Sequence, residues 1–302
     1  MINKYYQAIK EAVDSEGIIT DDKVLTGFSG HRMVRLLQNV SKVRLNDSTC
    51  YVEVGVFQGL TLLSVAKEVK NAPVYGIDNF AFFDRNGKNL SIVNERTKKL
   101  QLSNVNIINE DYEDALENLA THIGNKKVGV YFVDGPHDYR SQLMCLELIK
   151  PFLAEDAIII IDDCNYRHVR QANRDFLFNN KEFKLMFESY TKCHPLNLND
   201  NERKEAEKDF WNGVNVLVKD SGNKLKESYP PTHRDRTLFE NEHIIQTSKH
   251  PDAITHLLPL SNYFGGFIKS LSKKKAAQPG KFKMMNTYSD ELPKNQFNSS
   301  LS

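Results

Sequence analysis

The chain has 302 residues, long enough for one large domain or for a catalytic domain with appended segments. Its 40 basic and 39 acidic residues leave a formal net charge of +1, so no overall field marks nucleic acid or a membrane surface as its partner. The N-terminus lacks the apolar stretch of a secretory signal, and nowhere do roughly 18 uncharged apolar residues run together. We therefore expect a soluble, cytoplasmic protein.

Two amphipathic helices are predicted at the N-terminus, over Ile2–Val13 and His31–Val43, because apolar residues recur there at three- and four-residue spacing. Such helices suit a cap over a site, a cover for a sheet, or the contact of a homodimer. The sequence does not choose among these three uses.

Short apolar runs then alternate with helical patterns, an arrangement typical of parallel strands joined by helical crossovers. The runs that predict strands are Thr49–Val54, Val74–Ile77, Val105–Ile108, Val128–Val133 and Ala157–Ile161. The predicted crossover helices are Leu60–Val69, Ser91–Leu102, Glu113–Ile123 and Tyr139–Ile149. After them we expect a helix over Arg167–Asn179 and two weaker strands, Lys184–Tyr190 and Gly213–Val218, which suit an antiparallel hairpin.

These elements predict an α/β fold: a Rossmann-like, doubly wound, mostly parallel sheet of seven strands with helices on both faces. The expected division is a helical cap over residues 1–44, the sheet domain over 45–220 and a C-terminal extension over 221–271. Residues 272–302 are rich in Lys, Asn, Ser and Pro, which predicts a disordered tail.

Acidic residues follow all five of the first strands. They are Glu53, Asp78, Glu110 with Asp111, Asp134, and Asp162 with Asp163. In open parallel sheets ligands bind beyond the carboxyl ends of the strands, so these positions are the first place to look for function.

The turn after the first strand carries two glycines, Gly55 and Gly59, which allow a ligand to approach the backbone closely. A tight turn with purely structural glycines has the same appearance. The spacing is not the G-x-G-x-x-G that cradles a pyrophosphate, and the preceding acid, Glu53, suits a cationic or hydroxyl-bearing ligand. Asp78, 25 residues later, suits ribose hydroxyls, so the pattern indicates a nucleoside without phosphates.

The aspartates Asp134, Asp162 and Asp163 are expected at the tips of neighbouring strands, where carboxylate oxygens suit magnesium or another hard divalent cation. The plainer interpretation is that they cap helices and pair with nearby cations. His137, three residues after Asp134, stands in a turn where it would accept a proton near neutral pH. Its plainer role is to cap the next helix or to form a hydrogen bond with an adjacent Asp.

The pattern E-x-G-x-x-x-G, followed by the acid of the second strand and Asp111, resembles the class I S-adenosylmethionine-dependent methyltransferases over roughly residues 45 to 220. The resemblance implies that Glu53, Gly55 and Gly59 line the methionine part of the cofactor and that Asp78 holds its ribose. It also implies that Asp111 and Tyr112 border the adenine. We count Thr61 and Asn79, in the same two turns, among the cofactor-binding residues.

The turn D-G-P-H-D-Y with the later I-D-D resembles one branch of that family, the metal-dependent O-methyltransferases of the catechol and macrolide-sugar type. The resemblance implies metal ligation by Asp134, Asp162 and Asp163, with His137 as general base. Catechol-type enzymes usually have Asp-Asn where this chain has Asp162-Asp163, which adds a negative charge and leaves the choice of metal open. In addition, Leu153-Ala-Glu-Asp156 stands where relatives often have two glycines.

The leading hypothesis is therefore metal-assisted O-methylation of a small hydroxylated molecule, with no nucleic acid or membrane partner. A metal-independent methyltransferase that uses His137 alone is the first alternative. A non-catalytic protein that senses the cofactor or serves as a scaffold is the second. Cys164, His168, Cys193 and His194 match no common zinc spacing, and the four cysteines are interpreted as reduced structural thiols.

Overall fold

The computed structural model describes residues 1–15, 24–84, 86–232 and 292–301. Its strands are β1 (Thr49–Val54), β2 (Val74–Ile77), β3 (Val105–Ile108), β4 (Lys127–Val133), β5 (Leu153–Ile161), β6 (Phe183–Ser189), β7 (Val214–Lys219) and β8 (Gln296–Phe297). Its helices are α1 (Ile2–Asp14), α2 (His31–Arg44), α3 (Leu60–Glu68), α4 (Asn89–Lys99), α5 (Tyr112–Glu117), α6 (Leu119–Ile123), α7 (Tyr139–Ile149), α8 (Arg167–Asn179) and α9 (Asp200–Lys208).

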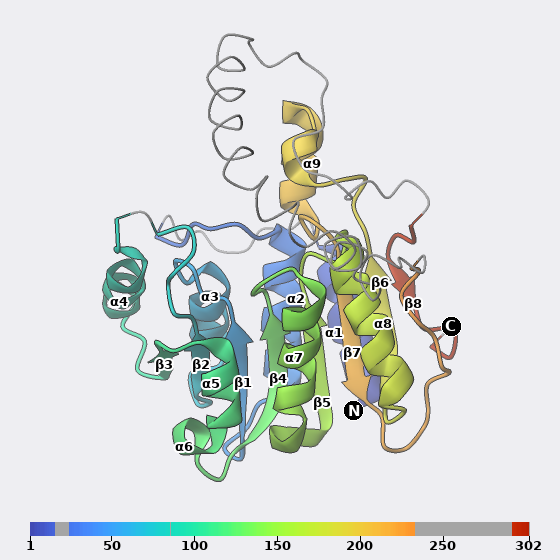
Figure 1. The fold of residues 1–302 in the computed structure, drawn as a ribbon, viewed down its shortest axis with the longest axis horizontal. Coiled ribbons are helices and arrows are strands. Elements are labelled where there is room, and N and C mark those ends of the chain that lie inside the picture. The colour runs from blue at the N-terminus through green and yellow to red at the C-terminus, as the bar shows by residue number, and fades with distance from the viewer. Residues whose placement is uncertain (16–23, 85, 233–291, 302) are drawn as a thin grey trace, which may run out of the picture. The chain divides into compact units, whose positions relative to one another are not determined.

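The strands form one sheet in the order β3-β2-β1-β4-β5-β7-β6-β8 (Figure 1). The pairs from β3 across to β5 are all parallel, whereas β7 runs antiparallel to both β5 and β6. The fold is thus Rossmann-like, and the expected antiparallel pair of β6 and β7 is present. The expected number of seven strands is wrong, because β8 adds an eighth at the edge.

Alternate residues of the central strands point to opposite faces, and each face has its own apolar core. In β4, Tyr131 and Val133 pack with α5 to α8, while Val130 and Phe132 pack with α1 to α3. Burial on both faces explains why these strands appear in the sequence as nearly continuous apolar runs. The four cysteines are buried and unbridged.

The N-terminal helices α1 and α2 cover one face of this sheet (Figure 1). Asn39 of α2 donates a hydrogen bond to the carbonyl of Ala8 in α1 at 3.1 Å, and Tyr5 donates to the carbonyl of Asp156 at 2.6 Å. Of the three uses left open by the sequence, the structure therefore shows the covering of the sheet. No helix among the described residues is long and apolar enough to cross a membrane.

Part of the C-terminal segment expected to be disordered is ordered against the sheet. Residues 292–301 place β8 antiparallel to β6, and the side chain of Asn298 donates to the carbonyls of Leu185 and Lys226. Polar composition concealed this contact, because a two-residue strand held by one buried asparagine leaves no apolar run in the sequence. Residues 272–291 of the expected tail lie outside the described residues.

Two further differences concern helices. The helix expected over 113–123 is divided into α5 and α6 at Asn118, and α9 was not predicted. Helix α9 begins with a capping box in which Asn199 and Glu202 satisfy each other's backbone N–H groups, a signal that can be read from sequence.

Candidate active site

Glu53, the second-last residue of β1, is a buried carboxyl group with two hydroxyl partners. Tyr51 donates to its Oε2 at 2.6 Å, and Thr61, in the first turn of α3, donates to its Oε1 at 2.8 Å. Burial raises the pKa of Glu53 to about 8, although both hydrogen bonds oppose the shift. Glu53 and Thr61, both expected at the cofactor, therefore lie together, and Glu53 is mostly protonated at neutral pH.

The two glycines of the first turn are required by backbone geometry. Gly55 has φ +94°, and a Cβ at this position would lie 2.0 Å from the carbonyl oxygen of Asp134. Gly59 has φ +81° and is the N-cap of α3. The close approach at Gly55 brings the end of β1 against the residue that follows β4.

Asp78, which follows β2, holds the same turn through backbone N–H groups. Its Oδ2 accepts from Val56 and Phe57 at 2.9 and 2.8 Å, and its Oδ1 accepts from Phe80 at 2.7 Å. The carboxylate expected at the ribose thus has main-chain partners in this structure and orders the turn around it. The adjacent Asn79 is exposed and accepts from the N–H of Ala81.

Asp111 and Tyr112, expected beside the adenine, begin α5 after β3. Asp111 caps this helix by accepting from the N–H of Glu113 at 2.9 Å. The hydroxyl of Tyr112 donates to the Glu113 carboxylate at 2.9 Å, and Arg140 pairs with the same carboxylate. The structure thus gives both residues local partners at a strand end.

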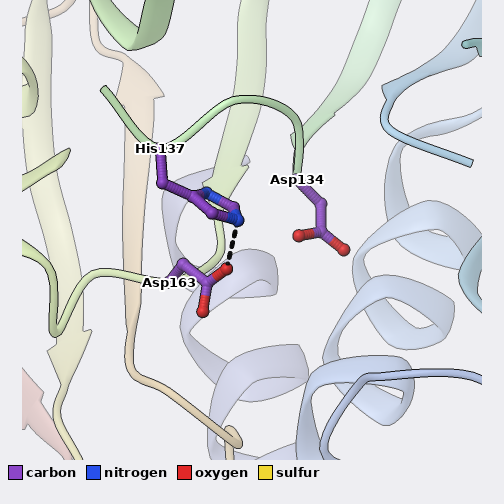
Figure 2. A group of neighbouring side chains, drawn as sticks. All are labelled: Asp134, His137 and Asp163. Carbon is purple, nitrogen blue, oxygen red and sulfur yellow. Dashed lines mark ion pairs between the residues drawn. The ribbon is translucent and has the colours of Figure 1, made fainter. Parts of the chain in front are cut away.

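Three of the predicted residues form one cluster at the ends of β4 and β5. Asp134, His137 and Asp163 each offer a ligand atom, and these atoms lie within 4.8 Å of one another. Figure 2 shows the three side chains converging, with His137 Nε2 2.7 Å from Asp163 Oδ2. No hydrogen bond to the Asp134 carboxylate is found within the described residues, so this group is open to a ligand.

The protonation of the cluster depends on its mutual charges. Burial and the charges of Asp162 and Asp163 raise the pKa of Asp134 well above its usual range. Burial alone would lower the pKa of His137, but the charge and hydrogen bond of Asp163 raise it. For Asp163, burial alone would raise the pKa, but its contacts with His137 and Asn212 hold the pKa below its usual value. The contact between His137 and Asp163 therefore favours the charged form of each, whereas ionisation of the neighbouring Asp134 is disfavoured.

Asp162, which was also expected to bind the metal, is not part of this cluster. It is 3% exposed, and its Oδ1 accepts from the N–H of Asp163 at 2.7 Å, so it lies outside the cluster of ligand atoms. The reason is local backbone geometry: Asp163 has φ +56°, a left-handed turn that directs its own side chain, and not that of Asp162, toward His137.

Three residues at this site were not predicted. The ring of Tyr166 stacks on His137 with 5.4 Å between ring centroids. The same Tyr166 ring also contacts His194, with 5.9 Å between centroids. Asn212 donates to Asp163 Oδ1 at 2.6 Å. His194 and Asn212 come from the loops before and after α9. No motif in these segments predicts that they pack against the strand ends.

Two surface hollows among the described residues are unrelated to this cluster. One is lined by α9 and His31, and the other lies between α1 and α2. Charged residues make up most of the first lining and polar or charged residues most of the second, and neither contains a strand-end residue. The chemistry of the chain is therefore better sought at the strand ends.

Comparison with known proteins agrees with this location. Residues 52–164 match the family described as a methyltransferase domain. An uncharacterized protein of Acanthamoeba polyphaga mimivirus is 28% identical over 142 residues, which cover 45% of this chain and 61% of that protein. The match thus spans less than two thirds of that relative's length.

Solved structures of methyltransferases are distant neighbours. The O-methyltransferase TomG from Streptomyces achromogenes, in complex with SAM, has a TM-score of 0.49 and 12% identity over 72% of this chain and 99% of that one. The O-methyltransferase from Bacillus cereus has a TM-score of 0.46 and 11% identity, covering 72% and 89%. An rRNA methylase from Streptococcus thermophilus has a TM-score of 0.42 and 18% identity, covering 63% and 95%.

The matched segment runs from β1 to the residue after Asp163 and so contains Glu53, Asp78 and the cluster at β4 and β5. On that match, residues 52–164 are similar to a methyltransferase domain.

Proposed function

We propose that the protein is an O-methyltransferase that acts, with the help of a divalent cation, on a small hydroxylated acceptor. A sugar or a vicinal diol is favoured because two adjacent oxygens can chelate one cation. The observation that carries this proposal is the convergence of Asp134, His137 and Asp163 within 4.8 Å. An oxygen acceptor needs a group that removes its proton while the methyl donor is aligned, and His137 in this cluster is a group of that kind.

The residues present fit a hard divalent cation. Asp134 carries an open carboxylate, and the charges of Asp162 and Asp163 disfavour its ionisation, a repulsion that a bound cation would relieve. Mg²⁺ is often held by one or two carboxylates together with waters, so Asp134 and Asp163 suffice as protein ligands. Asp162, buried and bonded to the backbone, borders the site without adding a ligand atom to the cluster.

His137 is the proposed general base. Asp163 engages its Nε2 at 2.7 Å, which leaves Nδ1 as the nitrogen available to accept the proton of the acceptor hydroxyl. Asp163 also stabilises the imidazolium that results, and Tyr166 stacks on the ring and limits its rotation. A cation at Asp134 supplies positive charge that favours loss of the same proton.

The cofactor is proposed to lie along the turns after β1, β2 and β3. Gly55, Gly59 and Thr61 form the first turn, while Asp78 fixes that turn through the N–H groups of Val56 and Phe57. Asn79, Asp111 and Tyr112 continue the row, and Glu53 anchors it from within the core. The family match over residues 52–164 supports this assignment.

A metal-independent reaction is the second candidate, and the His137–Asp163 pair favours it. A carboxylate 2.7 Å from one imidazole nitrogen is sufficient to orient and strengthen a base without a cation. Thorough chelation separates the two candidates: loss of turnover that magnesium restores supports the cation, and unchanged turnover supports the imidazole alone.

The first experiment is calorimetry of the full chain with S-adenosylmethionine and S-adenosylhomocysteine, followed by a screen of hydroxylated acceptors. Asp134→Ala and His137→Ala should each lower turnover by about 100-fold or more while changing the affinity for the product nucleoside less than about 2-fold. Asp47→Ala, at an exposed turn before β1, is the matched control. Normal turnover in both site variants would contradict the assigned roles, and binding of neither nucleoside would overturn the cofactor.

A further inference from the structure

Asp163 is held from two sides. Its Oδ2 meets His137 at 2.7 Å, and its Oδ1 accepts a hydrogen bond from the side-chain amide of Asn212 at 2.6 Å. Asn212 itself has no exposed surface. The carboxylate that pairs with the proposed base is therefore fixed by a residue from the loop that precedes β7.

The orientation of the Asn212 amide follows from its partner. A carboxylate only accepts hydrogen bonds, so the amide must present its nitrogen to Asp163. Its oxygen is then directed elsewhere, and within the described part of the chain this buried oxygen has no hydrogen-bond donor. A buried carbonyl without a donor destabilises a fold, so packing alone does not explain an asparagine here.

The backbone around Asn212 is fixed without its side chain. The N–H of Asn165 donates to the carbonyl of Asn212 at 2.9 Å, and the N–H of Cys164 donates to the carbonyl of Gly213 at 3.2 Å. Gly213 has φ +88°, and a Cβ there would lie 2.5 Å from Asn165 Oδ1, so the two turns interlock closely. A change of side chain at 212 should consequently leave the turns in place and remove only the contact with Asp163.

We propose that Asn212 is a positioning residue, which holds one oxygen of Asp163 so that the other stays directed at His137. This inference rests on the proposed function of the cluster and names a residue outside the matched methyltransferase segment. Without the amide, the Asp163 carboxylate rotates more freely, and both the orientation of His137 and the cation site are weakened. Cofactor binding, which depends on other turns, is unaffected.

The test compares Asn212→Ala and Asn212→Leu with Asn215→Ala in the full chain. Asn215 is an equally buried asparagine three residues along, whose amide hydrogen-bonds Asn173 and Tyr190 and not Asp163. Asn212→Leu keeps roughly the size of the side chain and removes the donor, which covers the case in which Asn212→Ala does not fold. Partners of this kind typically change metal affinity by about 10- to 100-fold.

Two readouts do not require a known acceptor. In protein with ¹⁵N-labelled histidine, the hydrogen-bonded Nε2 proton of His137, assigned through His137→Gln, should be shifted or lost in both Asn212 variants and unchanged in Asn215→Ala. Calorimetry with magnesium chloride should show affinity weakened by about 10-fold or more in the Asn212 variants only.

The outcomes separate this inference from the proposed function. An unchanged His137 resonance and unchanged magnesium affinity in both Asn212 variants would overturn the role of Asn212 while the cofactor site stands. Absence of the hydrogen-bonded resonance in folded wild-type protein would overturn it as well. Failure of the wild type to bind S-adenosylhomocysteine would instead count against the proposed function.

Discussion

Glu53 combines complete burial with a carboxyl group that accepts hydrogen bonds from Tyr51 and Thr61. Since burial raises its pKa from 4.5 to about 8, folded Glu53 keeps a proton that the unfolded chain releases. The contribution of this group to stability is therefore complete below about pH 4.5 and is lost as the pH rises through 8.

The corresponding prediction concerns the pH dependence of unfolding. The free energy of unfolding of Glu53→Gln should fall less than that of the wild type between about pH 4.5 and 8, because the amide has no proton to release. Urea unfolding at several pH values measures the free energy of unfolding of both proteins. The other buried carboxyl groups are the same in both, so their contributions cancel in the difference. Parallel curves for both proteins would show that Glu53 does not titrate in this range.

At the level of single residues, some contacts were predictable from sequence and others were not. Tyr51 and Glu53 are two positions apart on one strand and so share a face, which could have been inferred. The pairing of His137 with Asp163 instead of Asp162 depends on the left-handed backbone of Asp163. Nothing in two adjacent aspartates tells which of them turns toward the histidine.

The turn between β1 and α3 shows how an element positions the site. Gly55 and Gly87 both have positive φ, +94° and +63°, but only Gly55 lies against another backbone segment, the carbonyl of Asp134. A Cβ at Gly87 would have nothing within 4 Å. Substituting Gly87 therefore measures the cost of a positive φ alone, whereas substituting Gly55 adds the cost of a clash with the Asp134 backbone.

Gly87→Ala should lower the free energy of unfolding by about 1–2 kcal/mol, the cost of a left-handed backbone for an ordinary residue. Gly55→Ala should cost about 1–3 kcal/mol more, because its Cβ can be accommodated only by moving Asp134. Chemical denaturation measures both values, and magnesium calorimetry should show weaker binding only for Gly55→Ala. Equal costs would mean that β1 and the turn after β4 separate easily.

The short strand β8 is held by a side chain more than by its own two residues. Asn298, 5% exposed, donates to the carbonyls of Leu185 and Lys226 at 2.8 and 2.9 Å. Asn298→Ala should lower the free energy of unfolding by about 1–3 kcal/mol, since both carbonyls lose their donor. Asn106→Ala, at an exposed position of β3, should change it by less than about 0.5 kcal/mol. Similar values for both variants in urea unfolding would mean that residues 292–301 contribute little to the folded sheet.

For the whole molecule, the sequence predicts the sheet well and its attachments poorly. Burial on both faces makes β1 and β2 visible as apolar runs, and these two strands and β3 have the bounds expected from the sequence. The row of strand-end acids follows from that order. The loops that bring His194 to Tyr166 and Asn212 to Asp163 depend on long-range packing, which has no period in sequence. The site is thus predictable where strands carry it and hidden where loops complete it.

Ligand linkage tests the whole arrangement at once. A ligand that binds only the folded state stabilises it by about 2.7 kcal/mol at 100 times its Kd, which for domains of this class raises the Tm by roughly 5–10 °C. S-adenosylhomocysteine should produce such a shift in the wild type, and magnesium should add to it. Asp134→Ala should keep the nucleoside shift and lose the magnesium shift, because the two proposed sites lie at different strand ends. Loss of both shifts in Asp134→Ala, with an unchanged Tm in the absence of ligand, would mean that Asp134 belongs to the nucleoside site, and the cation would then have to be placed elsewhere.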